Sequence, residues 1–541
     1  MSHRPDAWQR HPLILLGAAA LVVYALALTN GFAYDDVVIV KGDVRVTQFQ
    51  FHEIVTRPYW SSPGFALYRP LVTLSFALDW AISHGHAAWF HAVNAIWHAL
   101  ATVALYVFLK AWFRTGPALV AALVFAVHPV HVEAVANVVG RAELMAATLF
   151  LLACALWAHE RPRYRPLRVA IVALLYAAAV LCKENAATLP AILLLIDAAR
   201  GKWTVPQLRQ RLRARAVDYG VLLVVLAGLI GLRAVLAGGA TPAQLDPVME
   251  VTQATGDRLR SALQIWPHIV RLLLYPNELL ADYGPRVLMP AAGWTPLVLL
   301  GLFMAATLTL GGLLLFDRGQ ALGALIMLWL PITLLPVANL LFPIGVMLAE
   351  RTLYLPSVAV SLGLALLLAQ LQREADALPR WSLAVCALVL LFCVVRVQMR
   401  IPDWDSTDSI MLAQRRDRPE SFRAEWHAAR MARRDGQSEV AIQRYQHAVR
   451  LWPYRERLIV ESAAYLSQQR ALLAALRVAG YGAEKWPRNL QLQRLLASNA
   501  LDLGDTTTAR KALAAGLRID PRDALLLRMS ATLNPGKAAH E

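Results

Sequence analysis

Long apolar runs constrain this sequence more than any other feature. A helix needs about 20 mostly apolar residues to cross the hydrocarbon layer of a membrane. Eleven candidate runs start near residues 12, 88, 117, 144, 167, 186, 217, 294, 320, 353 and 380. The sixth run is short and contains Pro190. The sequence therefore predicts an all-α fold that begins with a multi-pass membrane domain of about eleven spans over residues 1–399.

Composition agrees with a membrane protein and narrows the classes of function. Of the 541 residues, 57% are apolar and 17% are charged, which excludes a disordered polar chain and disfavours a wholly soluble enzyme. Lys and Arg number 53 against 37 Asp and Glu, a net charge of +16. Basic loops resist translocation, and the loops 159–168 and 199–216 are dense in Arg. Membrane lipid is thus the expected surrounding, and no nucleic-acid partner is needed.

The positions of these charges also predict the topology. With the N-terminus inside and an odd number of spans, the outer loop 30–86 and all residues after about 399 lie on the non-cytoplasmic side. If the protein is bacterial, it lies in the inner membrane and that side is the periplasm. If it is eukaryotic, that side is the lumen. Ala25-Leu26-Ala27 imitates a signal-peptide cleavage site, and the predicted topology survives cleavage there.

The tail, residues 400–541, is charged and repetitive. Pro419, Pro453, Pro487 and Pro521 are spaced at the tetratricopeptide period of about 34 residues. Small residues occupy the two close-packing positions of each repeat, at Ala429, Ala441, Ala463, Ala475, Ala497 and Ala509. We therefore expect three repeats, 422–455, 456–489 and 490–523, with a capping helix over 523–532. Such a solenoid usually binds an extended peptide on its concave face, and packing against the membrane domain is the alternative.

Ionisable residues at the ends of apolar spans are functional candidates, because lipid does not tolerate them without a reason. Asp35 and Asp36 follow the first span as adjacent acids in Phe32-Ala33-Tyr34-Asp35-Asp36. Repulsion between neighbouring carboxylates raises one pKa, so either residue could be a general base or a metal ligand. The alternative is a helix cap or a solvated pair in a loop.

A second group of polar residues follows the third span. His128 and His131 could hold a metal ion, but the spacing fixes no third ligand, and interfacial histidines that satisfy free carbonyls are the alternative. Glu133, Arg141 and Glu143 stand within the next turns. No cofactor is required by these motifs, and a divalent metal remains open.

Further polar residues are predicted on the same outer side. His91, Asn94 and His98 form one helical stripe, which must face protein or a cavity rather than lipid. Lys183 and Glu184 end the fifth span, and the tenth begins with Glu350, Arg351 and Tyr354. Pooling of acids and bases at one interface suits a site that takes a lipid-borne substrate from the membrane and an acceptor from the water outside.

The ordered set of motifs resembles the transmembrane and tetratricopeptide-repeat-containing O-mannosyltransferases, which have the glycosyltransferase C fold. The matching stretches are FAYDD, YRPLVTLSF, FHAVNAIWHA, HPVHVEAVANVVGRAEL, KEN and AERTLYLPS. They run from the first span to the tenth, and the repeats of the tail complete the resemblance.

This resemblance implies an inverting transfer of a sugar, mannose in the first place, from a polyprenyl-phosphate donor to a hydroxyl. The acceptor would be Ser or Thr of an exported protein that the repeats hold. Asp35, with a slight preference, or Asp36 would be the catalytic base. Arg351, Lys183 and Arg141 would bind the donor phosphate. The expected substrate-orienting residues are Glu133, His128, His131, Glu143, Tyr68, Arg69, Glu184, Glu350, Tyr354, His91 and Asn94.

Three other functions compete with this expectation. Another lipid-linked glycan transferase or ligase, acting on glycolipid or pilin, would share the donor chemistry, but it would need a large outer loop late among the spans. A non-enzymatic membrane-anchored repeat scaffold would leave the buried acids and bases unexplained. A transporter is disfavoured because the polar groups pool on one side instead of marking a path across the membrane.

Overall fold

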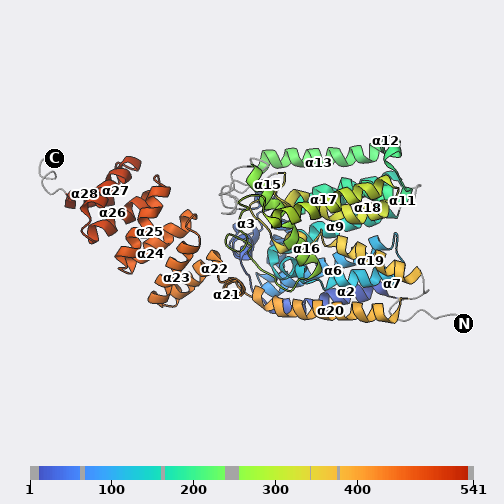
Figure 1. The fold of residues 1–541 in the computed structure, drawn as a ribbon, viewed down its shortest axis with the longest axis horizontal. Helices are drawn as coiled ribbons and strands as arrows, with labels where there is room; N and C mark the ends of the chain where they lie inside the picture. Colours follow the sequence, from blue (N-terminus) through green and yellow to red (C-terminus); the bar gives the residue numbers. More distant parts are fainter. Residues whose placement is uncertain are drawn as a thin grey trace. The chain divides into compact units, whose positions relative to one another are not determined.

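The computed structural model describes residues 11–60, 67–159, 165–237, 255–341, 343–373 and 378–533. Two basic positions of the predicted inner loop, Arg161 and Arg163, lie outside these ranges. The chain divides into two compact units, Met1–Tyr283 with Pro290–Ile410, and Gly284–Met289 with Met411–Glu541. Every regular element within the described ranges is helical, as the sequence predicts (Figure 1).

The first unit contains the predicted membrane helices. Six helices are long and apolar enough to cross a membrane in the described part of the chain: α6 (Ala87–Leu109), η4 with α9 (Val138–Ala158), α10 (Arg165–Cys182), α13 (Ala216–Ala237), α17 (Pro296–Asp317), and α20 with η9 (Arg380–Trp404). The number is seven if the bent pair of α7 (Thr115–Ala126) and Pro129–Ala136, which meet at 47°, is counted as one span. The protein is therefore a multi-pass membrane protein.

The other predicted runs also contain helices, but shorter ones. These are α2 (Pro12–Val23), α11 (Leu189–Gly201), α18 (Ala321–Leu334) and α19 (Val358–Arg373). Proline explains two of the short lengths. Pro190 stands in the first turn of α11, the one part of a helix where the missing N–H of proline is tolerated, so α11 begins there. Pro331 and Pro336 interrupt the end of α18. The eleven predicted runs thus each hold a helix, six or seven of them of full spanning length.

Short helices connect the membrane helices and shape the candidate site. They are η1 (Ala25–Thr29), η2 (Val37–Lys41), α3 (Val44–Thr47), α4 (Phe51–Thr56), α5 (Pro70–Ser83), η3 (Pro129–His131), α8 (Val132–Ala136), η4 (Val138–Gly140), η6 (Glu184–Thr188), α12 (Val205–Ala214), α15 (Thr255–Gln264), α16 (Trp266–Leu274), η7 (Leu335–Val337), η8 (Glu350–Leu353) and η9 (Ile401–Trp404).

Helix α9 is the centre of the first unit. It packs against α6, α10 and α11, and 89% of its apolar 18-residue stretch is buried. Only 6% of the corresponding apolar stretch of α13 is buried, so α13 lies at the periphery of the unit. Helices α9 and α10 follow each other directly and pack together as antiparallel neighbours. The start of α9 and the end of α10 therefore lie at one end of the bundle.

The second unit is a solenoid of helix pairs. Its elements are α21 (Thr407–Asp417), which begins in the first unit, then α22 (Phe422–Arg434), α23 (Ser438–Leu451), α24 (Glu456–Gln468), α25 (Leu472–Lys485), α26 (Leu490–Asp502), α27 (Thr506–Ile519) and α28 (Ala524–Leu533). The first helices of the pairs begin at 422, 456 and 490, which is the tetratricopeptide spacing. The expected repeat fold is confirmed.

The packing of the solenoid follows the small residues named from the sequence. All six register alanines, from Ala429 to Ala509, are fully buried between helices. Gly436 and Gly504 turn between the helices of their pairs with φ of 75° and 77°, a conformation that glycine adopts without strain. The four cysteines of the chain, Cys154, Cys182, Cys386 and Cys393, are buried and free.

Candidate active site

The turn that carries the twin aspartates is tied to the segment that follows α20. Asn30 Nδ2 donates to the Ile401 carbonyl, and the Gly31 N–H donates to the Asp405 carbonyl, each at 2.9 Å. The Tyr34 N–H donates to Thr407 Oγ1, also at 2.9 Å. Tyr34 itself has φ of 54°, which a non-glycine residue adopts only when its surroundings hold it there. These contacts fix the backbone immediately before Asp35.

Asp36 points into the protein. Its Oδ1 accepts the Val139 N–H at 2.8 Å, and its Oδ2 accepts the N–H groups of Val138 at 3.1 Å and Ala33 at 3.3 Å. Burial raises the pKa of Asp36 to about 7, although these three hydrogen bonds lower it. The carboxyl group thus joins the aspartate turn to η4, and its oxygens are occupied by the backbone.

Asp35 points in a different direction, towards a cation. Its Oδ2 lies 3.8 Å from Nη2 of Arg351, and the two side chains are 23% and 19% exposed. Arg351 is held from behind by the fully buried Glu133, which pairs with Nη1 and accepts the Arg351 backbone N–H at 2.9 Å. The negative charges of Glu133 and Asp35 raise the pKa of Arg351 in spite of its burial. This arrangement leaves one carboxylate and one guanidinium partly open to a ligand.

Two more cations share this neighbourhood. Lys183 Nζ lies 2.7 Å from Glu143 Oε1, and Arg69 Nη2 lies 2.8 Å from Glu184 Oε2. Burial lowers the pKa of Lys183 more than Glu143 raises it, and the positive charges of Arg69 and Arg351 lower it further. Burial alone would raise the pKa of Glu184, but the cations, Arg69 first, bring it down to about 2. Each cation is therefore fixed by its own acid, and their charges act on one another.

Arg141 has partners of its own. Its guanidinium is fully buried, donates to Asn94 Oδ1 at 2.8 Å and to the Phe90 carbonyl at 3.0 Å, and forms an ion pair with Asp79. Asn94 in turn donates to three carbonyls between residues 135 and 138. The donors of Arg141 thus meet protein acceptors, which link the start of α9 to α5 and α6.

The predicted histidines also bind protein groups. His128 Nε2 contacts the Leu273 carbonyl at 3.0 Å, His131 Nε2 contacts Ser357 Oγ at 2.9 Å, and His91 Nε2 contacts the Gly31 carbonyl at 3.0 Å. The Tyr354 hydroxyl lies 2.7 Å from His98 Nδ1. Within the described ranges no three His, Cys, Asp or Glu side chains are grouped so that they could hold a metal ion. His128 thus contacts a carbonyl, as one of the two alternatives expected from the sequence has it, whereas His131 contacts a hydroxyl.

Glu350 and Tyr68 position loops. Glu350 Oε1 accepts the Tyr283 hydroxyl at 2.7 Å and the Leu280 N–H at 2.5 Å. Burial raises the pKa of Glu350 to about 7, because the effect of burial outweighs that of nearby Arg400, which lowers the pKa. Tyr68 donates its hydroxyl to the Val55 carbonyl at 2.7 Å. Neither side chain meets the Asp35–Arg351 pair in the contacts described.

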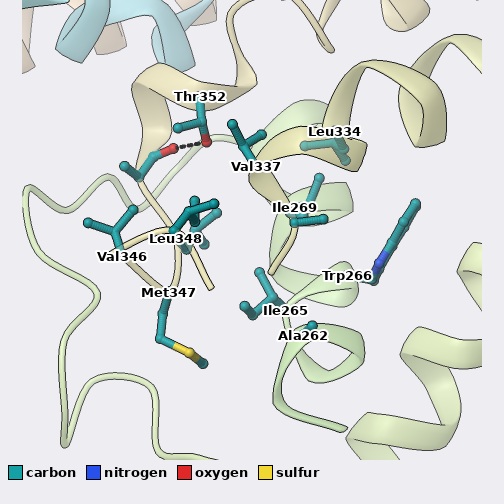
Figure 2. A pocket seen from close by; sticks show the side chains of 13 residues that line it. Ala262, Ile265, Trp266, Ile269, Leu334, Val337, Val346, Met347, Leu348 and Thr352 are labelled. Carbon is teal, nitrogen blue, oxygen red and sulfur yellow. Dashed lines mark hydrogen bonds between the residues drawn. The ribbon is translucent and has the colours of Figure 1, made fainter. Parts of the chain in front are cut away.

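An apolar pocket borders η8, next to Arg351. Ala349 and Thr352 line it, together with Ile265 and Ile269 of the α15–α16 region and Leu334 at the end of α18. Figure 2 shows these side chains around the pocket, with the hydrogen bond from Thr352 Oγ1 to the Ala349 carbonyl at 2.7 Å. The pocket places hydrocarbon surface beside the charged residues.

Three contributing residues were missed by the sequence interpretation. Asp79 stands in an apolar stretch, and an acid there is a signal that could have identified it. Tyr59, whose ring centroid lies 5.1 Å from the Arg69 guanidinium, and Thr407 carry no local signal. They become visible only when distant segments meet.

Apolar spans, a polar group at the end of the central helices, and tetratricopeptide repeats define a multi-pass membrane protein with a repeat domain. No protein-family model matches the chain. Protein O-mannosyl-transferase TMTC3 of Homo sapiens is 27% identical over 450 residues, which cover 74% of this chain and 47% of that protein. Protein O-mannosyl-transferase F38B6.6 of Caenorhabditis elegans is 26% identical over 460 residues, 82% of this chain and 63% of that protein.

Protein O-mannosyl-transferase Tmtc2 of Drosophila melanogaster is 33% identical over 290 residues, which cover 50% of this chain and 30% of that protein. The chain is therefore a relative of the TMTC protein O-mannosyl-transferases. It spans about half the length of the first of these curated relatives, TMTC3.

Proposed function

We propose that this protein is an integral-membrane glycosyltransferase that moves mannose from a polyprenyl-phosphate donor to a Ser or Thr hydroxyl of an exported protein. The observation that carries the proposal is the Asp35–Arg351 pair, a partly exposed base and cation 3.8 Å apart at a membrane-protein site. The names of the relatives, all protein O-mannosyl-transferases, support the choice of sugar and of acceptor class.

In the proposed reaction, Asp35 removes the proton of the acceptor hydroxyl as the hydroxyl oxygen attacks the anomeric carbon from the face opposite the phosphate. The bond between this carbon and the phosphate oxygen breaks, and polyprenyl phosphate leaves with the electron pair, so the configuration inverts. Arg351 and Lys183 neutralise the departing phosphate. Glu133 and Glu143 hold these two cations in place.

Two features support the polyprenyl-phosphate donor in particular. The paired cations suit a phosphate group, because each keeps an acid on one side and the Arg351 side chain is partly exposed. Apolar side chains beside Arg351 would also give an isoprenoid chain hydrocarbon surface next to the phosphate subsite (Figure 2).

The active site and the repeats belong on the non-cytoplasmic side in this proposal. The exposed Arg residues of α12 support that orientation, because α12 lies at the end of the first unit opposite to α3 (Figure 1). The tetratricopeptide repeats would hold an extended segment of the acceptor protein while one hydroxyl reaches Asp35.

The test uses the purified full chain with radiolabelled polyprenyl-phosphate mannose and a Ser/Thr-rich acceptor peptide. We expect labelled peptide from the wild type and none above background from Asp35→Asn. Glu53→Gln is the matched control, since Glu53 is an exposed acid of the same loop that pairs with Arg57, and it should keep full activity. Transfer to glycolipid or pilin instead of peptide, or undiminished transfer by Asp35→Asn, would overturn the proposal.

A further inference from the structure

A second charged feature lies in the first unit, away from the candidate active site. The segment from Ala198 to Val217 contains no acid and six cations, Arg200, Lys202, Arg209, Arg211, Arg213 and Arg215. Half of it is helix α12, which joins the apolar helices α11 and α13 (Figure 1). A helix with this many charges cannot enter hydrocarbon, so α12 must lie at the level of the lipid headgroups.

One end of α12 is anchored by buried acids. Arg215 Nη1 lies 3.1 Å from Asp197 Oδ1 and 4.0 Å from Asp218 Oδ2. Arg165 Nη2 donates to the Ala214 carbonyl at 3.3 Å and pairs with Asp218. Asp197 also accepts the indole N–H of Trp157 at 3.0 Å. The ends of α9, α10, α11 and α13 thus hold α12 at a fixed position.

The other five cations of the segment are free of such anchors. Among the described residues no acid pairs with Arg200, Lys202, Arg209, Arg211 or Arg213, and all five are exposed. Leu208 and Leu212, one turn apart, are half-buried, so α12 rests on one apolar face and presents Arg209, Arg211 and Arg213 elsewhere. The cations of the candidate active site differ from these five, because each of them is paired with an acid.

We propose that α12 is a binding surface for anionic phospholipid headgroups. A fixed row of guanidinium groups at headgroup level complements lipid phosphates, which guanidinium binds in a bidentate geometry. Each cation close to an anionic lipid surface strengthens binding by roughly fivefold. Three exposed arginines on an anchored helix therefore select anionic over zwitterionic lipid. The surface does not depend on the proposed transfer reaction.

The experiment measures which lipids the full chain retains. The protein is purified in detergent, mixed with equal amounts of phosphatidylglycerol and phosphatidylcholine, repurified and analysed by mass spectrometry for lipid bound per protein. We expect phosphatidylglycerol to exceed phosphatidylcholine at least about tenfold in the wild type. The triple variant Arg209→Gln, Arg211→Gln, Arg213→Gln should lose most of that preference.

A matched control removes the same charge from the repeats. Arg477, Arg488 and Arg510 are exposed on the solenoid, and their triple replacement by Gln should leave the lipid preference intact. The corresponding Arg→Lys triple of α12 keeps the charge and should retain most of the preference, which shows that loss in the Gln variant is electrostatic. An unchanged preference in the α12 Gln variant, or displacement of the lipid by equimolar inorganic phosphate, would overturn the proposal.

Discussion

The backbone N–H of Val139 donates to Oδ1 of Asp36 at 2.8 Å, although the two residues are 103 positions apart in the sequence. Val138 makes a similar bond to the other carboxylate oxygen. These contacts turn Asp36 inwards and leave Asp35 beside Arg351. The two adjacent acids therefore have different environments, and we assign them different roles.

Separate substitutions of the two aspartates should have opposite signatures. Asp35→Asn should lower turnover about 100 to 10,000-fold, because the base is lost, and should leave the unfolding midpoint unchanged. Asp36→Ala leaves backbone N–H groups without their acceptor and should lower the free energy of unfolding by about 3 kcal/mol. Transfer assays and thermal unfolding in detergent measure the two effects. The assignment fails if Asp35→Asn unfolds the protein while Asp36→Ala only lowers turnover.

The Glu133–Arg351 pair should govern donor binding. Arg351→Lys removes the planar fork that contacts Glu133 and that we propose binds the donor phosphate, and should raise the KM for the polyprenyl donor about tenfold or more. Glu133→Gln should act in the same direction by releasing Arg351. Arg57→Lys, at an exposed pair of the same loop as Asp35, should change nothing. A KM that stays at the wild-type value in Arg351→Lys would show that the phosphate binds elsewhere.

Stability should decrease as the pH rises towards neutrality. The pKa of Glu350 is about 7 in the folded protein against 4.5 ordinarily, so its stabilising contribution is complete below the ordinary value and is lost as the pH rises through 7. The unfolding midpoint should therefore fall between about pH 5 and about pH 8, and Glu350→Gln should reduce this fall. Asp36, whose pKa is also about 7, accounts for part of the remainder.

Glu184→Gln provides the matched control for this pH dependence. The pKa of Glu184 is lowered to about 2, so its contribution is lost only at far more acidic pH. This variant should lower stability by a similar amount across the tested range and keep the wild-type slope. Parallel slopes for wild type and Glu350→Gln would contradict the prediction.

Gly140 should not accept a side chain. A Cβ at this position would lie 2.3 Å from the Ala134 carbonyl oxygen and 2.7 Å from its carbon, both of them backbone atoms. Gly140→Ala should therefore displace η4, weaken its hydrogen bonds to Asp36, and destabilise the protein by about 3 kcal/mol. Gly228→Ala, where no atom lies within 4 Å, should shift the unfolding midpoint little. Equal midpoints for the two variants would be the contrary result.

Thr407 should position the aspartate turn. Thr407→Val keeps the shape of the side chain but removes the acceptor of the Tyr34 N–H. We expect turnover to fall about tenfold through misplacement of Asp35, with an unchanged KM for the donor. Thr407→Ser retains a hydroxyl and should restore turnover. A rise in KM without loss of turnover would argue against a positioning role.

Much of the fold could be predicted from sequence, because its causes are local or periodic. Apolar runs of spanning length predicted the membrane helices, and the spacing of Ala429, Ala463 and Ala497 predicted the buried contacts between repeat helices. The residues of the candidate site were also identifiable, since ionisable groups at the ends of apolar spans are energetically costly and are therefore functional candidates. The lengths of individual spans were less predictable, because prolines such as Pro331 shorten helices within long apolar runs.

The tertiary structure alone decided which residue faces which. Asp35 and Asp36 are the same residue type in the same turn, and no local property distinguishes them. Arg141, predicted to bind the donor phosphate, lies among Asp79, Asn94 and Phe90, whereas the Arg351 side chain is partly exposed. The composition and spacing of the sequence predict which segments enter the membrane, but they do not specify which atoms meet in hydrogen bonds and ion pairs. Their partners depend on the packing of segments that are far apart in the chain.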